Sequence, residues 1–351
     1  MYENSLKSTL CHNFTWCLAM RILVTGGGGY IGSVLVDELL KEGHEVTVLD
    51  NLIWGIQGVC INFGKPRFTF VEGDVRNDEL VCSVLKGQDV VVHLAALVGE
   101  NFCKTNKAQA SDVNVNGTRI MEKCLSDDQL LVFASTGSVY GLVNGTNCPE
   151  ETVANPLSHY AATKIQAEKI VSKKKNAVIL RFATAFGVSF RMRLDLLVNQ
   201  FVYEAVKYRT LLVYGEKSVR SVIHVRDIAQ SILFTIKHRD LMPGQVFNVG
   251  SSSLMFTKGQ IARQIKNQIE YDLQFGESCA DLDRRNYSLS TDKIEALGYR
   301  TKVSLDEGLF ELISTVKKIK VDKSYFNSGI ASEYTDNSRL LRQLSVFGGF
   351  P

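Results

Sequence analysis

The sequence predicts an α/β protein built on a doubly wound parallel sheet, with a smaller C-terminal lobe that binds substrate. Two observations support this prediction. Short apolar runs rich in β-branched residues alternate with segments of helical length, which is typical of βαβ units. The runs are apolar throughout instead of alternating with polar residues, which indicates strands covered on both faces.

Six such runs lie in the first half of the chain, and they predict strands at residues 21–24, 45–49, 68–71, 90–94, 130–134 and 177–181. Connections between parallel neighbours are expected to be right-handed crossovers. We therefore expect a Rossmann-type sheet domain over residues 20–187, preceded by an N-terminal extension at residues 1–19.

The pattern changes near residue 188. Longer, more polar helices are expected at residues 194–207, 225–237, 258–269 and 305–318, with short strands at 211–213 and 246–249. Residues 188–320 are expected to form mainly a second lobe. Residues 321–351 lack periodicity and are expected to form a peripheral tail.

Composition excludes several classes of protein. The net charge of +3 is a small difference between 40 basic and 37 acidic residues, and no basic run stands out. Nucleic acid is therefore not an expected partner. No apolar run reaches the length of about 18 residues that a membrane helix needs. The eight cysteines form no CxxC pair and the six histidines no HExxH pattern, so we expect a cytoplasmic protein in a reducing compartment, without a metal site.

A glycine-rich segment, Thr25-Gly-Gly-Gly-Gly-Tyr-Ile-Gly32, lies between the first expected strand and a helix that continues through Leu40. In this position Gly26 permits a tight turn, Gly29 lets the backbone approach a pyrophosphate, and Gly32 lets helix and strand pack closely. Tyr30 and Ile31 open the helix, whose first amides face the phosphates. The segment predicts a dinucleotide-binding site.

The second strand is followed by Asp50 and Asn51, close to the expected distance from the glycines. A carboxylate there accepts hydrogen bonds from ribose hydroxyls and repels a 2′-phosphate. Because no arginine neighbours it in the sequence, NAD is favoured over NADP. Asp74 and Val75 follow the third strand, where Asp74 either accepts a bond from the adenine amine or lies in a simple surface turn.

Tyr160 and Lys164 are one helical turn apart. A tyrosine with its ordinary pKa of about 10 is a poor base at neutral pH, but a neighbouring ammonium stabilises the phenolate. The pair can then take a hydroxyl proton while hydride leaves the same carbon. Thr136 follows the strand at 130–134, at the edge where open α/β sheets bind ligands.

Five motifs occur in one order and together resemble the NAD-dependent epimerase/dehydratase family of extended short-chain dehydrogenases/reductases over about residues 21–318. They are the glycine segment, Asn114-Val-Asn-Gly-Thr118, Ser135-Thr-Gly-Ser-Val-Tyr-Gly141, the Tyr160/Lys164 pair and Arg220-Ser-Val-Ile-His-Val-Arg-Asp227. The resemblance implies that Tyr160 is the general acid/base, that Lys164 lowers its pKa and holds the nicotinamide ribose, and that Thr136 bonds the reacting oxygen.

The same resemblance implies further contacts. Beyond the residues already named, the expected NAD contacts are Leu94, Ala95, Ala96, Asn114 and Ser135, and His93 is expected to line the dinucleotide with its neighbours. The expected contacts to a nucleotide diphosphate sugar are Val98, Thr136, Thr184, Asn199, Arg220 and either Arg284 or Arg285, with Arg285 preferred. A homodimer is expected through helices at residues 110–124 and 158–171.

Departures from the family pattern narrow the activity. Family members that eliminate water carry an acidic pair after the catalytic threonine, where this chain has Gly137 and Ser138, and decarboxylases also use a glutamate there. Thr184 stands where galactose epimerases often have asparagine. Residues 96–104 and 181–199 resemble a bacterial surface-polysaccharide subgroup that includes a GDP-manno-heptose C4 dehydrogenase.

We therefore expect an NAD-dependent nucleotide-sugar epimerase, similar to UDP-glucose 4-epimerase, that acts through a 4-keto intermediate. A C4 dehydrogenase of the GDP-heptose type shares the first half reaction and stays open, and a 4,6-dehydratase is disfavoured. A non-catalytic NAD sensor is a remote alternative, because such proteins commonly lose the residues retained here as Thr136, Tyr160 and Lys164.

Overall fold

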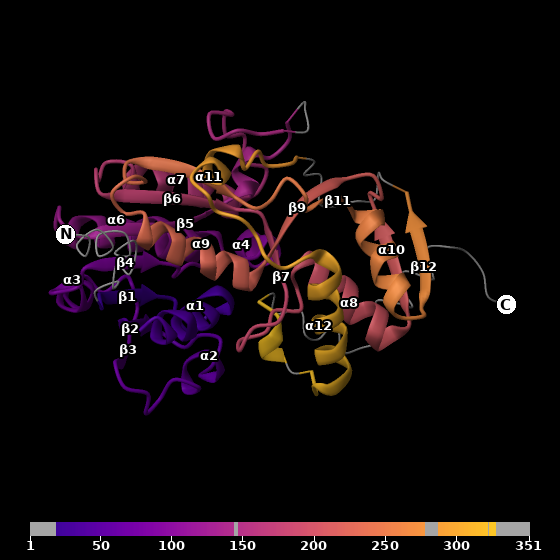
Figure 1. The fold of residues 1–351 in the computed structure, drawn as a ribbon, viewed down its shortest axis with the longest axis horizontal. Helices are drawn as coiled ribbons and strands as arrows, with labels where there is room; N and C mark the ends of the chain where they lie inside the picture. Colours follow the sequence, from indigo (N-terminus) through magenta and orange to yellow (C-terminus); the bar gives the residue numbers. More distant parts are fainter. Residues whose placement is uncertain (1–18, 144–146, 278–286, 322, 328–351) are drawn as a thin grey trace, which may run out of the picture.

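The computed structural model describes residues 19–143, 147–277, 287–321 and 323–327. Its centre is a seven-stranded sheet in the order β10-β6-β5-β4-β1-β2-β3, in which every pair is parallel (Figure 1). The strands are β1 (Arg21–Thr25), β2 (Glu45–Asp50), β3 (Phe68–Glu72), β4 (Val90–His93), β5 (Leu130–Thr136), β6 (Ala177–Phe182) and β10 (Gln245–Val249). The six strands predicted before residue 187 are confirmed to within two residues at each end.

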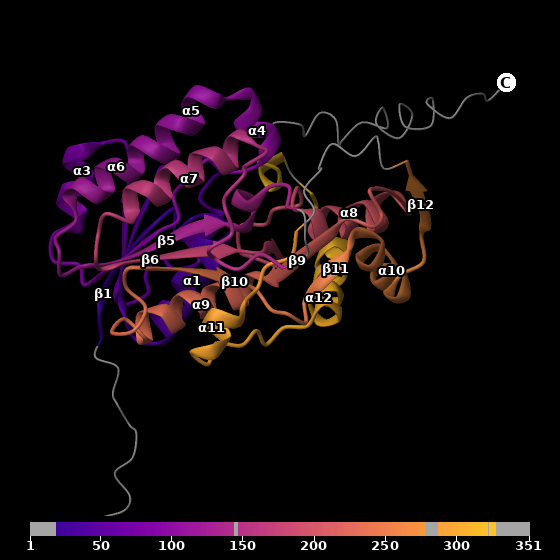
Figure 2. The same cartoon turned by 90° about the horizontal axis from the view of Figure 1, so that it is seen from above.

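Helices cover both faces of this sheet (Figure 2). One face carries α1 (Tyr30–Lys41) and α9 (Val225–Lys237), which pack against each other. The other carries α3 (Asp78–Leu85), α6 (Gly117–Cys124) and α7 (His159–Val171). Shorter turns complete the connections: α2 (Gln57–Cys60), α4 (Glu100–Thr105), α5 (Lys107–Ser111), a π-helical turn (Asp112–Asn116) and a 3-10 turn (Gly137–Tyr140). The doubly wound fold is thereby confirmed.

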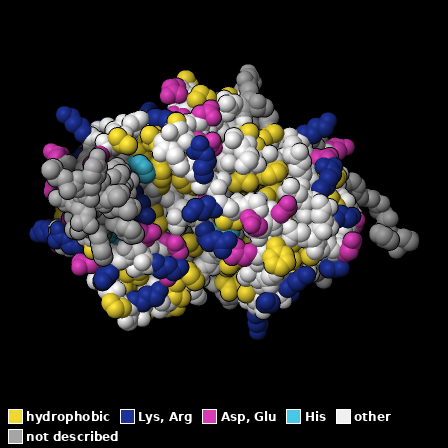
Figure 3. Space-filling view, in the orientation of Figure 1, with side chains coloured by type: hydrophobic (Ala, Val, Ile, Leu, Met, Phe, Trp, Pro, Cys, Tyr) yellow, Lys and Arg dark blue, Asp and Glu magenta, His cyan; other side chains and the backbone are white. Residues whose placement is uncertain are grey.

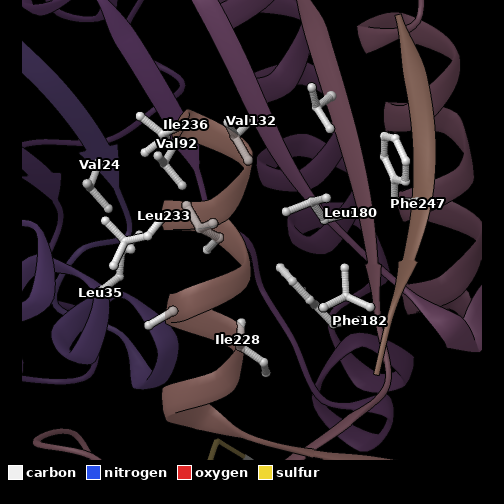
Figure 4. Close-up of a cluster of buried hydrophobic side chains, with 14 of the residues drawn as sticks. Val24, Leu35, Val92, Val132, Leu180, Phe182, Ile228, Leu233, Ile236 and Phe247 are labelled. Atoms are coloured by element: carbon white, nitrogen blue, oxygen red, sulfur yellow. The ribbon is translucent and has the colours of Figure 1, made fainter. Parts of the chain in front are cut away.

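The core beneath α9 shows why the strands are apolar on this face of the sheet. Ile228, Leu233 and Ile236 of this helix point toward the strand side chains, and all three are at most 2% exposed (Figure 4). Burying one such side chain contributes about 1.5–3 kcal/mol. The edge strand β3 is the exception, because its residues are only partly buried or exposed.

The boundary between the lobes is less simple than the sequence predicts. Strand β10 and helix α9, both expected in the second lobe, return to the sheet domain, where β10 pairs with β6. Helix α11 (Asp292–Ala296) packs on β10. Strand β10 begins about 60 residues after the end of β6, and a local apolar pattern does not show that two strands so far apart in the sequence pair with each other.

The second lobe has its own buried core. It contains α8 (Leu197–Tyr208), β8 (Thr210–Tyr214), α10 (Lys258–Gln268), β12 (Asp272–Gly276) and α12 (Leu305–Lys318). A three-stranded sheet of β7 (Thr184–Phe186), β9 (Val219–His224) and β11 (Met255–Thr257) runs from the sheet domain into this lobe (Figure 1). The segments that carry the expected substrate residues therefore meet the edge of the main sheet.

The first described residues of the C-terminal tail are not peripheral, which corrects the prediction for this part. A 3-10 turn (Lys323–Tyr325) is held where the Leu194 amide donates to the Tyr325 carbonyl at 2.8 Å. Phe326 is 3% exposed and meets the Tyr203 ring with centroids 5.7 Å apart. The rest of the tail and residues 1–18 of the N-terminal extension lie outside the described residues.

Two cysteines are joined, which the sequence patterns do not predict. A disulfide connects Cys82 of α3 to Cys124 of α6. Asp78 lies beside both sulfurs, but this cluster is not a set of metal ligands, because the two sulfurs are bonded to each other and Lys123 pairs with the Asp78 carboxylate at 2.7 Å. The expected reducing compartment stays a prediction.

Charged side chains of both signs are interspersed over the face seen in Figure 3. This agrees with the balanced composition. Among the described residues, no helix combines the length and apolar character needed to cross a bilayer.

Candidate active site

The glycine turn between β1 and α1 has room only for glycine at two positions. Gly26 adopts φ +72°, and a Cβ there would lie 2.7 Å from the Ala95 amide nitrogen. A Cβ on Gly32 would lie 2.3 Å from the Gly26 carbonyl oxygen. Helix α1 then starts at Tyr30, and its first turn has no side-chain cap. Amides at such a helix end bind anions, so this turn fits the diphosphate of a dinucleotide.

Asp50, at the end of β2, faces this turn. Its carboxylate accepts hydrogen bonds from the Gly28 amide at 2.9 Å and the Leu52 amide at 2.8 Å. Burial raises the pKa of Asp50, and these two amides oppose the shift. The structure thus places the carboxylate predicted for the ribose directly beside the glycine turn.

Asn51 and Asp74 come together from neighbouring strand ends. The Asn51 amide donates to Asp74 at 3.1 Å, and the Arg76 guanidinium donates to both Asp74 oxygens. Arg76 lowers the pKa of Asp74 to about 2. Both oxygens therefore already have partners, and a bond from Asp74 to adenine stays a prediction. Val75 is 5% exposed and belongs to the core.

The segment after β4 borders the turn from the other side. The Leu94 and Ala95 amides donate to Thr25 at 3.1 and 3.3 Å, and Leu94, Ala95 and Ala96 are partly buried. Asn114 fixes the continuation of this segment, because its side chain exchanges bonds of 2.7 and 3.0 Å with the Leu97 backbone. With 1% exposure, Asn114 positions this loop, and its predicted contact with the cofactor stays a prediction.

Helix α7 carries the predicted catalytic pair. Ser158 caps the helix by accepting a bond from the Ala161 amide at 3.2 Å, so Tyr160 lies in its first turn, partly buried. Lys164 is 4% exposed, and its Nζ lies 4.2 Å from the centre of the Phe133 ring of β5. Burial lowers the pKa of Lys164 to about 7, although the Glu168 carboxylate opposes the shift.

Thr136 ends β5, the strand against which α7 packs. Its Oγ1 accepts a bond from the Ser138 amide at 3.2 Å and so caps the 3-10 turn that also contacts α7. The fold thus brings the predicted hydroxyl to the same sheet edge as the tyrosine and lysine, as expected for the carboxyl end of a parallel strand.

A buried ionic network lies behind this pair, and the sequence analysis missed it. The Glu168 carboxylate accepts two bonds from Arg181 of β6, at 2.8 and 3.1 Å, and one from the Ser135 hydroxyl. Arg181 also donates to the Tyr140 hydroxyl at 2.9 Å. Ser135 therefore holds Glu168, and its predicted contact with NAD stays a prediction. The spacing of Glu168, one turn after Lys164, was the available signal.

His93 is buried beside the same lysine. Its ring lies between the hydroxyls of Thr25 and Thr118, at 2.7 and 3.2 Å. Burial, and secondarily the Lys164 ammonium, lowers the pKa of His93 to about 3. His93 is therefore neutral at physiological pH and supports the strand end without adding charge.

The predicted substrate residues lie on the side of the second lobe. Thr184 is partly buried in β7, and Val98 is partly buried in the loop that Asn114 holds. Asn199 is fully buried, accepting a bond from the Gly187 amide at 3.0 Å and donating to the Arg193 carbonyl at 2.8 Å. Asn199 thus holds the loop at residues 187–193 together, and its expected contact with the nucleotide sugar stays a prediction.

Arg220 of β9 is 2% exposed, and its Nη1 donates to the Val219 carbonyl at 2.7 Å. Arg285 and its alternative Arg284 lie outside the described residues, so their predicted contacts have no geometry. Substrate contacts by these arginines stay predictions.

Comparison with known proteins decides the family. The profile of the NAD dependent epimerase/dehydratase family matches residues 22–250. The chain belongs to this family. Its cofactor is accordingly NAD, as the glycine turn and Asp50 indicate.

Members of the NAD-dependent epimerase/dehydratase family match this chain over most of its length. A putative UDP-glucose 4-epimerase of Methanocaldococcus jannaschii is 28% identical and covers 84% of this chain and 98% of its own. The NAD complex of UDP-glucose 4-epimerase from Thermus thermophilus is 27% identical, with a TM-score of 0.74 over 85% of this chain and 99% of that one.

A dehydratase fits equally well. DesIV from Streptomyces venezuelae, a dTDP-glucose 4,6-dehydratase, is 28% identical, with a TM-score of 0.76 over 88% of this chain and 99% of that one. Overall similarity therefore establishes an enzyme family of NAD-dependent epimerases and dehydratases, and the choice between reactions depends on individual residues.

Proposed function

We propose that this protein is a nucleotide-sugar epimerase that inverts C4 through a 4-keto intermediate. The observation that carries the proposal is the set of Thr136, Tyr160 and Lys164 at one sheet edge, next to a glycine turn that fits NAD. The names of the Methanocaldococcus jannaschii relative, a putative UDP-glucose 4-epimerase, and of the Thermus UDP-glucose 4-epimerase support a sugar carried on UDP.

Bound NAD would supply a reversible acceptor for hydride from C4. Tyr160 removes the proton of the C4 hydroxyl, and Thr136 donates a hydrogen bond to the same oxygen. Lys164 in its charged form stabilises the phenolate. Tyr160 gives the proton back to the same oxygen in the second half of the reaction. Because bound NAD would return the hydride to the opposite face of the ketone, the sugar would be inverted without net consumption of the cofactor.

Gly137 and Ser138 argue against dehydration. Removing water from C5 and C6 requires a second acid and base beside the threonine, and these two buried residues offer neither a carboxylate nor a carboxylic acid. The similarity to DesIV therefore supports the shared oxidation step and not the elimination.

A nucleotide-sugar C4 dehydrogenase is the second candidate, because residues 181–199 resemble the subgroup with a GDP-manno-heptose dehydrogenase. This activity uses the same three residues but releases the keto sugar and leaves NADH, which must be reoxidised before the next turnover. A non-catalytic NAD sensor has less support, since such a protein has no need of a buried lysine beside a tyrosine.

The test is to incubate the purified protein with UDP-, GDP-, CDP- and dTDP-sugars while recording absorbance near 340 nm and product stereochemistry by NMR. An inverted C4 without NADH accumulation would support the epimerase. Stoichiometric NADH with a keto sugar would instead identify the dehydrogenase. Tyr160→Phe should lower turnover by about 100-fold or more, and undiminished activity in this variant would refute the mechanism.

We also propose a homodimer, in which α6 and α7 pack against the same helices of a second copy. These helices lie side by side on one face of the sheet domain (Figure 2), and twofold pairing is the commonest soluble assembly. Light scattering coupled to gel filtration should give twice the mass of 39.1 kDa, whereas a monomeric mass would refute the proposal.

A further inference from the structure

Arg191 is a buried cation whose guanidinium lacks hydrogen-bond partners among the described residues. It is 3% exposed, and its Nε and Nη2 are buried and make no hydrogen bond to any residue that the structure describes. Two other buried arginines differ from it: Arg181 pairs with Glu168, and Arg193 with Asp195 at 2.7 Å. Leaving a guanidinium buried and unpaired costs several kcal/mol, so this arrangement points to an anionic ligand.

The segment that carries Arg191 crosses from the second lobe to the glycine turn. The Tyr30 hydroxyl donates to the Gly187 carbonyl at 2.7 Å. The Ser189 hydroxyl donates to the Tyr30 carbonyl at 2.6 Å and lies 3.0 Å from the Ser33 hydroxyl. These bonds fix the backbone two residues before Arg191 against the first turn of α1, whose amides suit a diphosphate.

The side chains around the Arg191 guanidinium show where it lies relative to β2 and α1. Its carbon lies 5.1 Å from the centre of the Trp54 ring, in the segment after β2. Trp54 in turn meets Phe102 of α4 edge-to-face, with centroids 5.7 Å apart. Asp50 is near enough to attract the guanidinium electrostatically, but the two do not form an ion pair. Arg191 thus lies between the end of β2 and the start of α1.

Arg191 remains charged at neutral pH in this position. Burial, with the neighbouring Arg193, lowers its pKa to about 10, while Asp195 and Asp50 oppose the shift. A planar guanidinium suits the oxygens of a diphosphate, which it can bind with two parallel hydrogen bonds.

We propose that Arg191 binds the diphosphate of NAD from the side of the second lobe, opposite the glycine turn. The sugar nucleotide also carries a diphosphate, but Tyr30, Ser33 and Trp54 place Arg191 beside the cofactor end of the site. Both lobes then contact NAD, so release of the cofactor requires the segment at residues 187–191 to separate from α1. The proposal relies on the NAD dependence of the family and not on the epimerase reaction.

The test is NAD binding, measured by calorimetry on protein freed of nucleotide. Arg191→Met should weaken NAD affinity about 10- to 100-fold, the loss expected for charge-assisted hydrogen bonds. Arg191→Lys keeps the positive charge but loses the two parallel hydrogen bonds of the guanidinium. Its NAD affinity should lie between those of Arg191→Met and the wild type. Arg226→Met, which removes a half-exposed arginine paired with Glu311, controls for net charge and should bind NAD like the wild type.

Thermal stability distinguishes ligand binding from a structural role of Arg191, because a structural role predicts that Arg191→Met lowers the melting temperature of the apo protein. Because its charge is poorly compensated without NAD, the apo form of Arg191→Met should melt at or above the wild-type temperature, while the rise in melting temperature caused by NAD should shrink. An apo variant that melts lower and binds NAD with unchanged affinity would overturn the proposal.

Binding of UDP-glucose and of NADP shows which molecule supplies the phosphate that Arg191 contacts. UDP-glucose binding to NAD-loaded Arg191→Met should match the wild type, and a selective loss of UDP-glucose affinity would overturn the assignment to NAD. Likewise, a loss confined to NADP would assign Arg191 to a ribose 2′-phosphate and overturn the proposal. None of these binding measurements depends on whether the enzyme inverts C4.

Discussion

The Glu168–Arg181 pair, which lies next to Lys164 in the structure, gives a prediction that can be worked out from the structure. Both side chains are less than 10% exposed, and two hydrogen bonds of 2.8 and 3.1 Å join them. Removing one member of a buried pair leaves the other charge without compensation, at a cost of about 3–5 kcal/mol. Glu168→Gln keeps the shape and should lower the free energy of unfolding by about 3 kcal/mol.

A double-mutant cycle isolates the interaction from other effects. Arg181→Met removes the cation but also its bond to Tyr140, so the single variants alone overstate the pair. In the double variant neither charge of the pair is left uncompensated, and the coupling energy should be about 2 kcal/mol. Urea unfolding of apo protein, followed by circular dichroism, measures all four forms. A coupling energy below about 0.5 kcal/mol would refute this account of the network.

The same variant tests the link to catalysis. The Glu168 carboxylate raises the pKa of Lys164 against the effect of burial. Without that charge Lys164 loses its proton at lower pH, so the alkaline limb of the kcat profile for Glu168→Gln should move to lower pH. A profile that keeps its position while kcat falls would show a purely structural role.

Two further predictions concern the glycine turn and the lysine. Gly32→Ala places a methyl group 2.3 Å from the Gly26 carbonyl oxygen and should abolish NAD binding measured by calorimetry. The control is Gly250→Ala, whose methyl group would meet only side chains at 3.2 Å or more and which should still bind NAD. Normal NAD binding by Gly32→Ala would contradict the packing described. Burial lowers the pKa of Lys164 from 10.5 to about 7, so between these pH values the unfolded chain binds more protons than the folded one. The measured quantity is the unfolding free energy of the wild type minus that of Lys164→Met. This difference should rise by about 1–2 kcal/mol between about pH 7 and about pH 8.5. A constant or falling difference in urea titrations would show that Lys164 is not desolvated.

The sequence predicts best what depends on neighbours along the chain. Short apolar runs locate the first six strands of the sheet, and the spacing of Tyr160 and Lys164 on one helix places both residues at one sheet edge. The glycine motif is equally local, because turn, amides and helix all lie within a single short segment. These features could be found without knowing how distant segments meet.

The features that the sequence analysis missed depend on contacts between distant segments. No pattern near Arg191 shows that Ser189 two residues earlier is bonded to Tyr30, and a search for arginines beside Asp50 in the sequence cannot find it. Phe326 lies in a polar segment, yet it fills a gap next to Tyr203. Asn199 was singled out from the family pattern, but only the fold shows that its amide is used within the protein.

The outermost strand of the sheet has a consequence for biosynthesis. Until β10 emerges, β6 is an exposed edge whose residues are buried in the finished protein, and such an edge is prone to pair with other chains. The ribosome must make much of the second lobe before this edge is covered, which at typical elongation rates takes about 3–14 s after β6 is complete. A nascent chain of this protein therefore passes through a period in which its sheet is incomplete and the β6 edge is open to pairing with other chains, and a fragment that ends at residue 187 would keep that open edge permanently.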